Sequence, residues 1–410
     1  MTKISAFHLK LVQGVVSGAN LFILFRILSS EYFAFLSSQG TVMMALGILD
    51  LGLGVKFVNK NISAKRIKPT NPEFGSAQIF GLHQYIKSSL LLSSILTCLS
   101  VPMIQYFLRR FQIRLNSQNI ELIGLTTLIF LTANFASKVY LSMDRLVRLV
   151  KIQTLSSIIQ LALTFTIYVL KMNPISYVYI LGIPGVIVIF DLQFLLRKHY
   201  RELKSARGKT EKIHISLLMQ MVQICQTVLI LTISILLIKY QTDVEAAYSS
   251  LMLRIVTTLL AAMGMHFLQS WIDSSAKILF FRRITSTIPI IKSASTGKKN
   301  ATLIFMVLLL CCLLHLYLQF FSISYLIELA SVLWGLVVVT QLIFWSSYYA
   351  FLGKEKYLLL FLSSVVGVLS VIPTTLVGKN LGVIFPPLLY LNAQVASYLI
   401  LYLNRAKTQV

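Results

Sequence analysis

Apolar residues follow one another in long runs along most of this chain, and short polar segments separate the runs. A run of about 20 apolar residues crosses a ~30 Å hydrocarbon layer as an α-helix, which rises about 1.5 Å per residue. The pattern therefore predicts twelve membrane-spanning helices. They fall near residues 9–28, 34–55, 79–106, 120–140, 152–170, 177–196, 213–238, 246–268, 301–321, 329–351, 357–377 and 381–403.

Composition agrees with this all-α membrane class. Hydrophobic residues make up 57% of the 410 positions and charged residues only 12%, with a mean hydropathy of +0.80. A soluble domain carries about twice that charged fraction. The net charge of +24 resides mainly in the short segments between apolar runs, where basic residues set topology, so we expect no nucleic-acid partner.

The placement of basic residues predicts an orientation, because Lys and Arg collect on the cytoplasmic side of a membrane. With the N-terminus inside, 28 of the 37 Lys and Arg residues lie in inner segments and 7 in outer ones. We therefore expect both termini in the cytoplasm. A basic linker at residues 201–212 divides the chain into two predicted six-helix lobes, residues 1–200 and 213–410.

Several predicted helices carry a seam of polar side chains at helical spacing, and such faces avoid lipid. A seam either lines an aqueous cavity or makes hydrogen bonds between helices. Residues that share a face include Gln13, Ser17 and Asn20 in the first span, Ser157, Gln160 and Thr164 in the fifth, and Gln220, Gln223 and Thr227 in the seventh. We take Asn20, Gln220 and Gln223 as candidate substrate-binding residues.

Four ionisable residues in the predicted spans are candidates for a functional site. Arg254 is the deepest cation and has no acid three or four residues away; Lys87 lies closer to the inner side. An arginine at the centre of a helix costs roughly 2.5–3.5 kcal/mol on insertion scales, so both cations are candidate substrate ligands. Arg26 is a third candidate, although it lies near the outer interface, where it can also snorkel.

Asp50 is the carboxylate that we expect well inside a predicted span, and it shares a helix face with Gln39 and Gly54. It is a candidate site for a coupling proton or sodium ion; the alternative is an ion pair with Lys87 or Lys56. The four cysteines lie in spans without a CxxC motif, and the histidines have no ligand spacing. We therefore expect no metal or cofactor and no enzyme activity, only coupling to a proton or sodium gradient.

Two stretches resemble a known family. The sequences Arg26-Ile27-Leu28-Ser29 and Leu49-Asp50-Leu51-Gly52-Leu53-Gly54 are similar to the first two spans of Wzx-type O-antigen flippases, of the multidrug/oligosaccharidyl-lipid/polysaccharide exporter superfamily. A second similarity is Gln269-Ser270-Trp271 followed by Ala276, although the Gly-Asp that the family has after this motif is not recognisable.

The resemblance implies two six-helix lobes around a central cavity that opens alternately to each side. The implied substrate is an undecaprenyl-pyrophosphate-linked oligosaccharide, an O-antigen or capsule repeat unit, moved to the periplasmic leaflet of the bacterial inner membrane. It also implies membrane lipids, an O-antigen polymerase and a chain-length regulator as partners. By position, Arg26 and Arg254 match cations of related lipid flippases.

Two other functions compete with this one. A cation-coupled multidrug or small-solute antiporter of the same superfamily ranks second, because it predicts more buried acids than Asp50 alone. A membrane glycosyltransferase or polymerase ranks third, because every predicted outer loop is short and none brings two carboxylates together.

Overall fold

A computed structural model of the chain describes residues 6–50, 53–54, 57–58, 61, 82–113, 117–143, 145–173, 176–198, 217–253, 256–257, 325–353 and 356–405. Every regular element in these ranges is helical. Seven of the described helices are long and apolar enough to cross a membrane. The predicted ninth span and most of the eighth lie outside the described residues, as do the linker at 201–212 and the segment 271–300.

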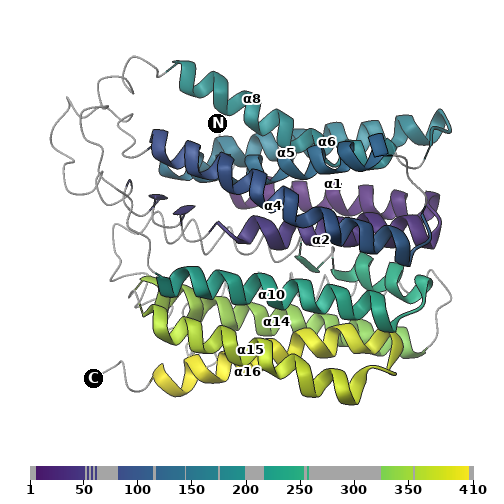
Figure 1. The fold of residues 1–410 in the computed structure, drawn as a ribbon, viewed down its shortest axis with the longest axis vertical. Coiled ribbons are helices and arrows are strands. Elements are labelled where there is room, and N and C mark those ends of the chain that lie inside the picture. Colours follow the sequence, from purple (N-terminus) through teal and green to yellow (C-terminus); the bar gives the residue numbers. More distant parts are fainter. Residues whose placement is uncertain are drawn as a thin grey trace. The chain divides into compact units, whose positions relative to one another are not determined.

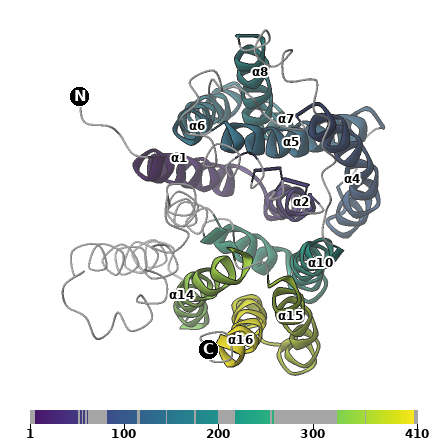
Figure 2. The ribbon, with the colours of Figure 1, turned by 90° about the vertical axis from the view of Figure 1, so that its left-hand side faces the viewer.

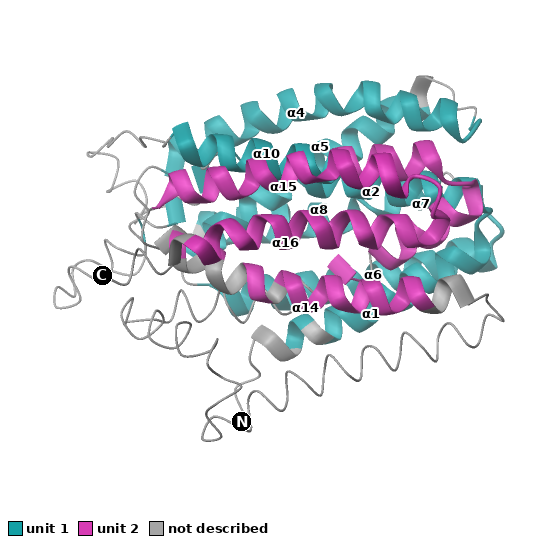
Figure 3. Ribbon diagram, turned by 90° about the horizontal axis from the view of Figure 1, so that it is seen from below, with its two compact units in different colours: residues 1–231 teal, residues 232–410 magenta. Residues whose placement is uncertain are grey.

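The chain divides into two compact units, Met1–Leu231 and Thr232–Val410, which Figure 3 colours separately. The division falls inside one helix, whereas the predicted lobe boundary falls in the linker. The predicted lobe boundary at residues 201–212 therefore stays a prediction, and each unit is described by itself.

The first unit begins with two antiparallel helices, α1 (Ala6–Ile27) and α2 (Ser30–Ile48), joined by the short turn that the sequence predicts. Ser29 is the N-cap of α2, and its side chain accepts a hydrogen bond from the backbone N–H of Tyr32. This bond satisfies one of the backbone donors that a helix start leaves unpaired.

Among the described residues, the first unit continues with α4 (Leu82–Arg110), α5 (Ser117–Ser142), α6 (Leu146–Val169), α7 (Ser176–Ile180) and α8 (Ile183–Lys198). Helix α10 (Leu217–Tyr240) begins in this unit. Helix α1 packs on α6, whereas α2 packs on α4 and α5, as Figures 1 and 2 show. The predicted sixth span is two helices, because the chain turns at residues 181–182 between α7 and α8.

The second unit contains the end of α10, a helical stretch at 243–253, and three long elements. These are α14 (Tyr325–Gly353), α15 (Tyr357–Gly378) and α16 (Phe385–Arg405), the last preceded by the short 3₁₀ helix η4 (Gly382–Ile384). Helix α16 packs on both α14 and α15. Trp334 is fully buried in the apolar core of this unit, with its ring 5.8 Å from that of Tyr390.

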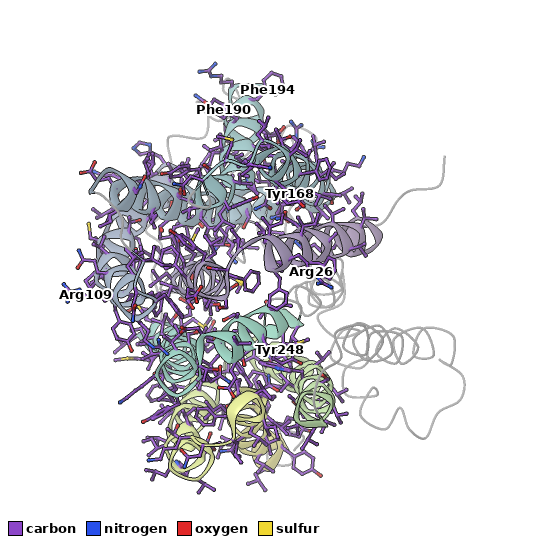
Figure 4. The ribbon with its side chains drawn as sticks, turned by 90° about the vertical axis from the view of Figure 1, so that its right-hand side faces the viewer. Arg26, Arg109, Tyr168, Phe190, Phe194 and Tyr248 are labelled. Atoms are coloured by element: carbon purple, nitrogen blue, oxygen red, sulfur yellow. The ribbon has the colours of Figure 1, made fainter. Side chains whose placement is uncertain are left out.

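Large apolar side chains also cover the outside of both units. Phe190 and Phe194 are 67% and 65% exposed, and Figure 4 shows them extending away from α8; Val377 in the second unit is 85% exposed. An apolar surface of this extent is unfavourable in water and favourable against the acyl chains of a lipid bilayer. The chain is a multi-pass membrane protein.

Candidate functional site

The second span is broken near its end, and the break places a carboxylate inside the first unit. Helix α2 stops at Ile48, and the backbone N–H of Asp50 donates to the carbonyl of Ile48, two residues back. Helical backbone resumes at Leu53, whose N–H donates to the Asp50 carbonyl. Discontinuous spans of this kind form substrate and ion sites in many secondary transporters, because their free backbone groups need partners.

Two side chains from other helices compensate for the break. The Asn134 side chain of α5 donates to the Gly47 carbonyl, and the Thr227 hydroxyl of α10 donates to the Ala45 carbonyl at 3.1 Å. Asn134 reaches this position because Gly47 has no side chain: a Cβ there would lie 2.7 Å from the Asn134 amide nitrogen. The break is therefore built into the packing of the unit.

The Asp50 carboxylate is 2% exposed and accepts hydrogen bonds through both of its oxygens. The Gln223 amide of α10 donates to Oδ1 at 2.7 Å, and the Gly54 backbone N–H donates to Oδ2 at 3.1 Å. We call Asp50, Gly54, Gln223, Asn134 and Thr227 the break cluster.

The break cluster is closely packed. A Cβ on Gly54 would lie 2.2 Å from Asp50 Oδ2 and 3.0 Å from Cγ of Lys138, so only glycine fits this approach. Three residues after Gly54, Phe57 stacks on Tyr85 of α4 with a centroid separation of 4.2 Å. The Tyr85 hydroxyl donates to the Phe135 carbonyl, which ties α4 to α5.

The break cluster has a carboxylate as its acidic centre, and neutral groups supply these two hydrogen bonds. An ionised Asp50 accepts from both Gln223 and Gly54. A protonated Asp50 becomes a donor and requires an acceptor, so the bond to Gln223 has to rearrange. The described residues hold no group of three or more metal-ligating side chains.

A second polar region lies where α1 packs on α6, and we call it the α1–α6 seam. It brings together the polar faces predicted for the first and fifth spans. Asn20 is 5% exposed and Thr164 1% exposed, and neither the Asn20 carbonyl oxygen nor the Thr164 hydroxyl has a hydrogen-bond partner among the described residues. Gln39 in α2 is likewise buried, with both amide atoms unpaired.

The other predicted site residues are dispersed. Gln220 is half-buried one turn before Gln223 on α10. Lys87 is exposed on α4, on the opposite face from the buried Tyr85. Arg26 is exposed as well, with its guanidinium carbon 5.7 Å from the Phe22 ring centre, and Figure 4 shows it on α1. Arg254 lies outside the described residues.

Sequence reasoning missed two polar contacts of the first unit. Arg148 binds Asp191 through two hydrogen bonds of 2.9 and 2.7 Å, and the Tyr140 hydroxyl donates to the same carboxylate at 2.6 Å. The second contact joins Lys10 of α1 to Gln153 of α6 at 3.0 Å. Lys10 and Arg148 were expected only to set topology, and nothing in their local sequence indicates a partner on another helix.

Comparison with solved structures identifies the fold of this chain, whereas comparison of sequences does not. No protein-family model matches the chain, and no curated protein matches it in sequence. Among solved structures, a eukaryotic MATE transporter, AtDTX14, is similar with a TM-score of 0.61 and 12% identity, covering 98% of this chain and 94% of that one. A MATE protein in complex with MaD3S gives a TM-score of 0.60 and 15% identity, covering 98% and 94%.

A third structure is the inward-facing form of a multidrug resistance MATE family transporter of the MOP superfamily. Its TM-score is 0.56 at 15% identity, with 100% of this chain and 96% of that one covered. These likenesses show a MATE-like fold and confirm the expected class, an all-α membrane protein of about 12 spans in two lobes. The sequence expectation named a different branch of the same superfamily, the Wzx-type flippases.

Proposed function

We propose that this protein is a cation-coupled antiporter that exports a small organic solute, with Asp50 as the site of the coupling proton or sodium ion. The observation that carries the proposal is the buried Asp50 carboxylate at a break in a membrane span, held by Gln223 of another helix. An acidic residue inside a membrane is expensive to keep unless it has a function.

Protonation of Asp50 would change the contact between the end of α2 and α10. The ionised carboxylate accepts the Gln223 amide hydrogen, whereas the protonated acid has to donate to an acceptor. The cation therefore favours one packing of these helices over another. An antiporter requires this differential stability, because a ligand shifts a conformational equilibrium only through unequal affinity for its two states.

The likeness to multidrug MATE structures supports this function over the flippase that the sequence motifs favoured. It supports the antiporter only as an analogy of fold, because one fold can host several functions. The site itself has to be tested directly.

The test is efflux from proteoliposomes loaded with ethidium as a fluorescent organic cation. We expect an imposed proton or sodium gradient to drive efflux by the native protein, and Asp50→Asn to abolish the dependence on the gradient. Glu121→Gln, which removes an exposed carboxylate of α5, is the matched control and should behave as the native protein. Gradient-driven efflux that survives in Asp50→Asn would refute the assignment.

A lipid-linked oligosaccharide flippase of the bacterial inner membrane is the second candidate. The exposed cations Arg26 and Lys87 favour it, because a pyrophosphate headgroup needs basic ligands along its path. Its substrate would be the undecaprenyl-pyrophosphate-linked repeat unit, passed on to an O-antigen polymerase and a chain-length regulator. Arg254→Ala should then stop surface polysaccharide export while the protein stays in the membrane; normal export would remove this candidate.

A further inference from the structure

Lys10 is held at the start of the α1–α6 seam in a way that solvated lysines are not. Its ammonium donates to the Gln153 side-chain oxygen at 3.0 Å, and the side chain is only partly exposed. One residue earlier, the Leu9 carbonyl accepts a hydrogen bond of 3.1 Å from the Thr154 hydroxyl. Two adjacent contacts therefore fix this end of α1 against α6 and direct the ammonium toward the neighbouring helix.

This ammonium lacks a counter-charge in the described part of the chain. Its hydrogen-bond partner is a neutral amide, and no described carboxylate lies within 4.0 Å of it, whereas Arg148 of α6 is paired with Asp191 of α8. An ammonium has three N–H donors, of which Gln153 takes one. A partly buried cation with an uncharged partner is unfavourable unless an anion completes its surroundings.

Gln13 adds a second incomplete group on the same face. It lies three residues after Lys10 on α1, so the two side chains are neighbours along the helix. Its side-chain oxygen is buried and has no donor among the described residues. The Gln13 oxygen is enclosed by the protein, whereas Lys10 is partly exposed, so Lys10 is the group that a ligand from the membrane can reach.

The depth of the site indicates where that ligand comes from. The apolar part of α1 runs from Val12 to Ile27, and Lys10 precedes it by two residues, or about 3 Å along the helix axis. Lipid phosphates lie in the interfacial layer just outside the hydrocarbon. A lysine that only snorkels would extend away from the protein into water, whereas the Lys10 ammonium is bound to α6.

We propose that the start of the α1–α6 seam binds the phosphate of an anionic membrane lipid, with Lys10 as the phosphate ligand. Two sources share this chemistry: a bulk anionic lipid such as phosphatidylglycerol, and a sugar attached to a polyprenyl pyrophosphate. The site involves neither Asp50 nor a small organic solute, so it goes beyond the proposed antiporter.

The test measures lipid binding to the purified, delipidated full-length protein by native mass spectrometry. The probes are phosphatidylglycerol, a polyprenyl-pyrophosphate-linked sugar, and phosphatidylcholine as the zwitterionic reference. We expect at least one of the two anionic probes to bind more tightly than phosphatidylcholine. Lys10→Gln should weaken that binding about tenfold, which corresponds to the loss of a charged hydrogen bond. Preference for phosphatidylglycerol assigns a bulk-lipid site, and preference for the sugar-linked probe a substrate site.

Two variants separate the site from general charge. Lys151→Gln removes an exposed lysine two residues from Gln153 on the opposite face of α6 and should leave binding unchanged. Lys10→Arg keeps the charge and should retain binding, which also excludes misfolding as the cause of a loss in Lys10→Gln. Three outcomes would overturn the proposal. Lys10→Gln could bind as tightly as the native protein, or Lys10→Gln and Lys151→Gln could lose binding equally. The third is that neither anionic probe binds more tightly than phosphatidylcholine.

Discussion

Gln223 donates a hydrogen bond to Asp50 across 173 positions of sequence, at a distance of 2.7 Å and with both residues at most 5% exposed. The bond joins the broken end of the second span to α10. A buried amide that satisfies a buried carboxylate stabilises the packing only while that carboxylate is ionised. Stability and protonation are therefore linked at this contact, and substitutions at either residue should affect both.

Gln223→Leu should destabilise the protein and weaken gradient-driven efflux. The change removes the Gln223 donor from a buried carboxylate, which costs about 1–3 kcal/mol. The expected results are a lower melting temperature in detergent and a smaller gradient response in the ethidium assay. Gln220→Leu, one turn away on the same helix, is the control. Losses of equal size in both variants would contradict a specific role for Gln223.

Gly54→Ala should disrupt the break cluster by steric contact alone. The added methyl group would lie 2.2 Å from Asp50 Oδ2, so the carboxylate has to leave its hydrogen bonds or the backbone has to move. Overpacking of this kind costs about 1–3 kcal/mol. Gly124→Ala, where an added Cβ meets no atom within 4 Å, is the matched control and should keep the native melting temperature or raise it slightly. Equal melting temperatures for the two variants would show that Gly54 tolerates a side chain.

Arg148→Lys should weaken the link between α6 and α8. The guanidinium makes two hydrogen bonds to Asp191, and an ammonium cannot reproduce this fork geometry. Because both side chains are partly exposed, at 37% and 24%, we expect a modest loss of about 1 kcal/mol. Thermal unfolding with Arg145→Lys, an exposed neighbour, as control checks this. A lower melting temperature for the control than for Arg148→Lys would contradict the assignment.

The helices could be predicted from the sequence because membrane insertion leaves a strong local signal. The run at 82–110 is predominantly apolar and forms α4, close to the range expected. The early end of α2 could not be predicted, because residues 34–55 are continuously apolar apart from Asp50 and a few small polar residues. Its cause lies in Asn134 and Thr227, which bind the released carbonyls from distant helices.

The candidate site could be predicted in part. Asp50 and Gln223 were each chosen from polar residues inside apolar runs, but nothing local indicates that they bind each other. Asp191 was not among the residues chosen, and its pairing with Arg148 left no local signal in the sequence. Pairing between helices depends on their packing, which hydrophobic periodicity alone does not determine.

Ser29→Ala should destabilise the start of α2 in a pH-dependent way. Ser29 caps the helix, and its hydroxyl, together with the Glu31 backbone, lowers the pKa of Glu31 from its ordinary value of 4.5. A lowered pKa in the folded state contributes stability that is present above pH 4.5 and is lost as pH falls through the folded pKa. We expect a loss of about 1 kcal/mol near neutral pH from the missing cap.

Melting temperatures measured between pH 7 and pH 3 check this prediction. The difference between Ser29→Ala and the native protein should narrow below pH 4.5, because both forms then carry a protonated Glu31. Ser29→Asp keeps a capping oxygen and should remain close to native at neutral pH. A difference that widens toward acid would mean that the contribution of Glu31 has the opposite sign.

A reporter fused after Leu403 should be active only in the cytoplasm. The prediction follows from the 28 Lys and Arg residues expected in inner segments against 7 in outer ones, since basic loops resist translocation. Helix α16 ends at Arg405, so the fusion point lies at the end of the last described helix. Alkaline phosphatase, which requires the periplasm, should be inactive at this position, and green fluorescent protein should fluoresce. A second fusion after Lys171, in a predicted outer segment, should give the reverse result. Phosphatase activity after Leu403 would place the C-terminus outside and would contradict the predicted orientation.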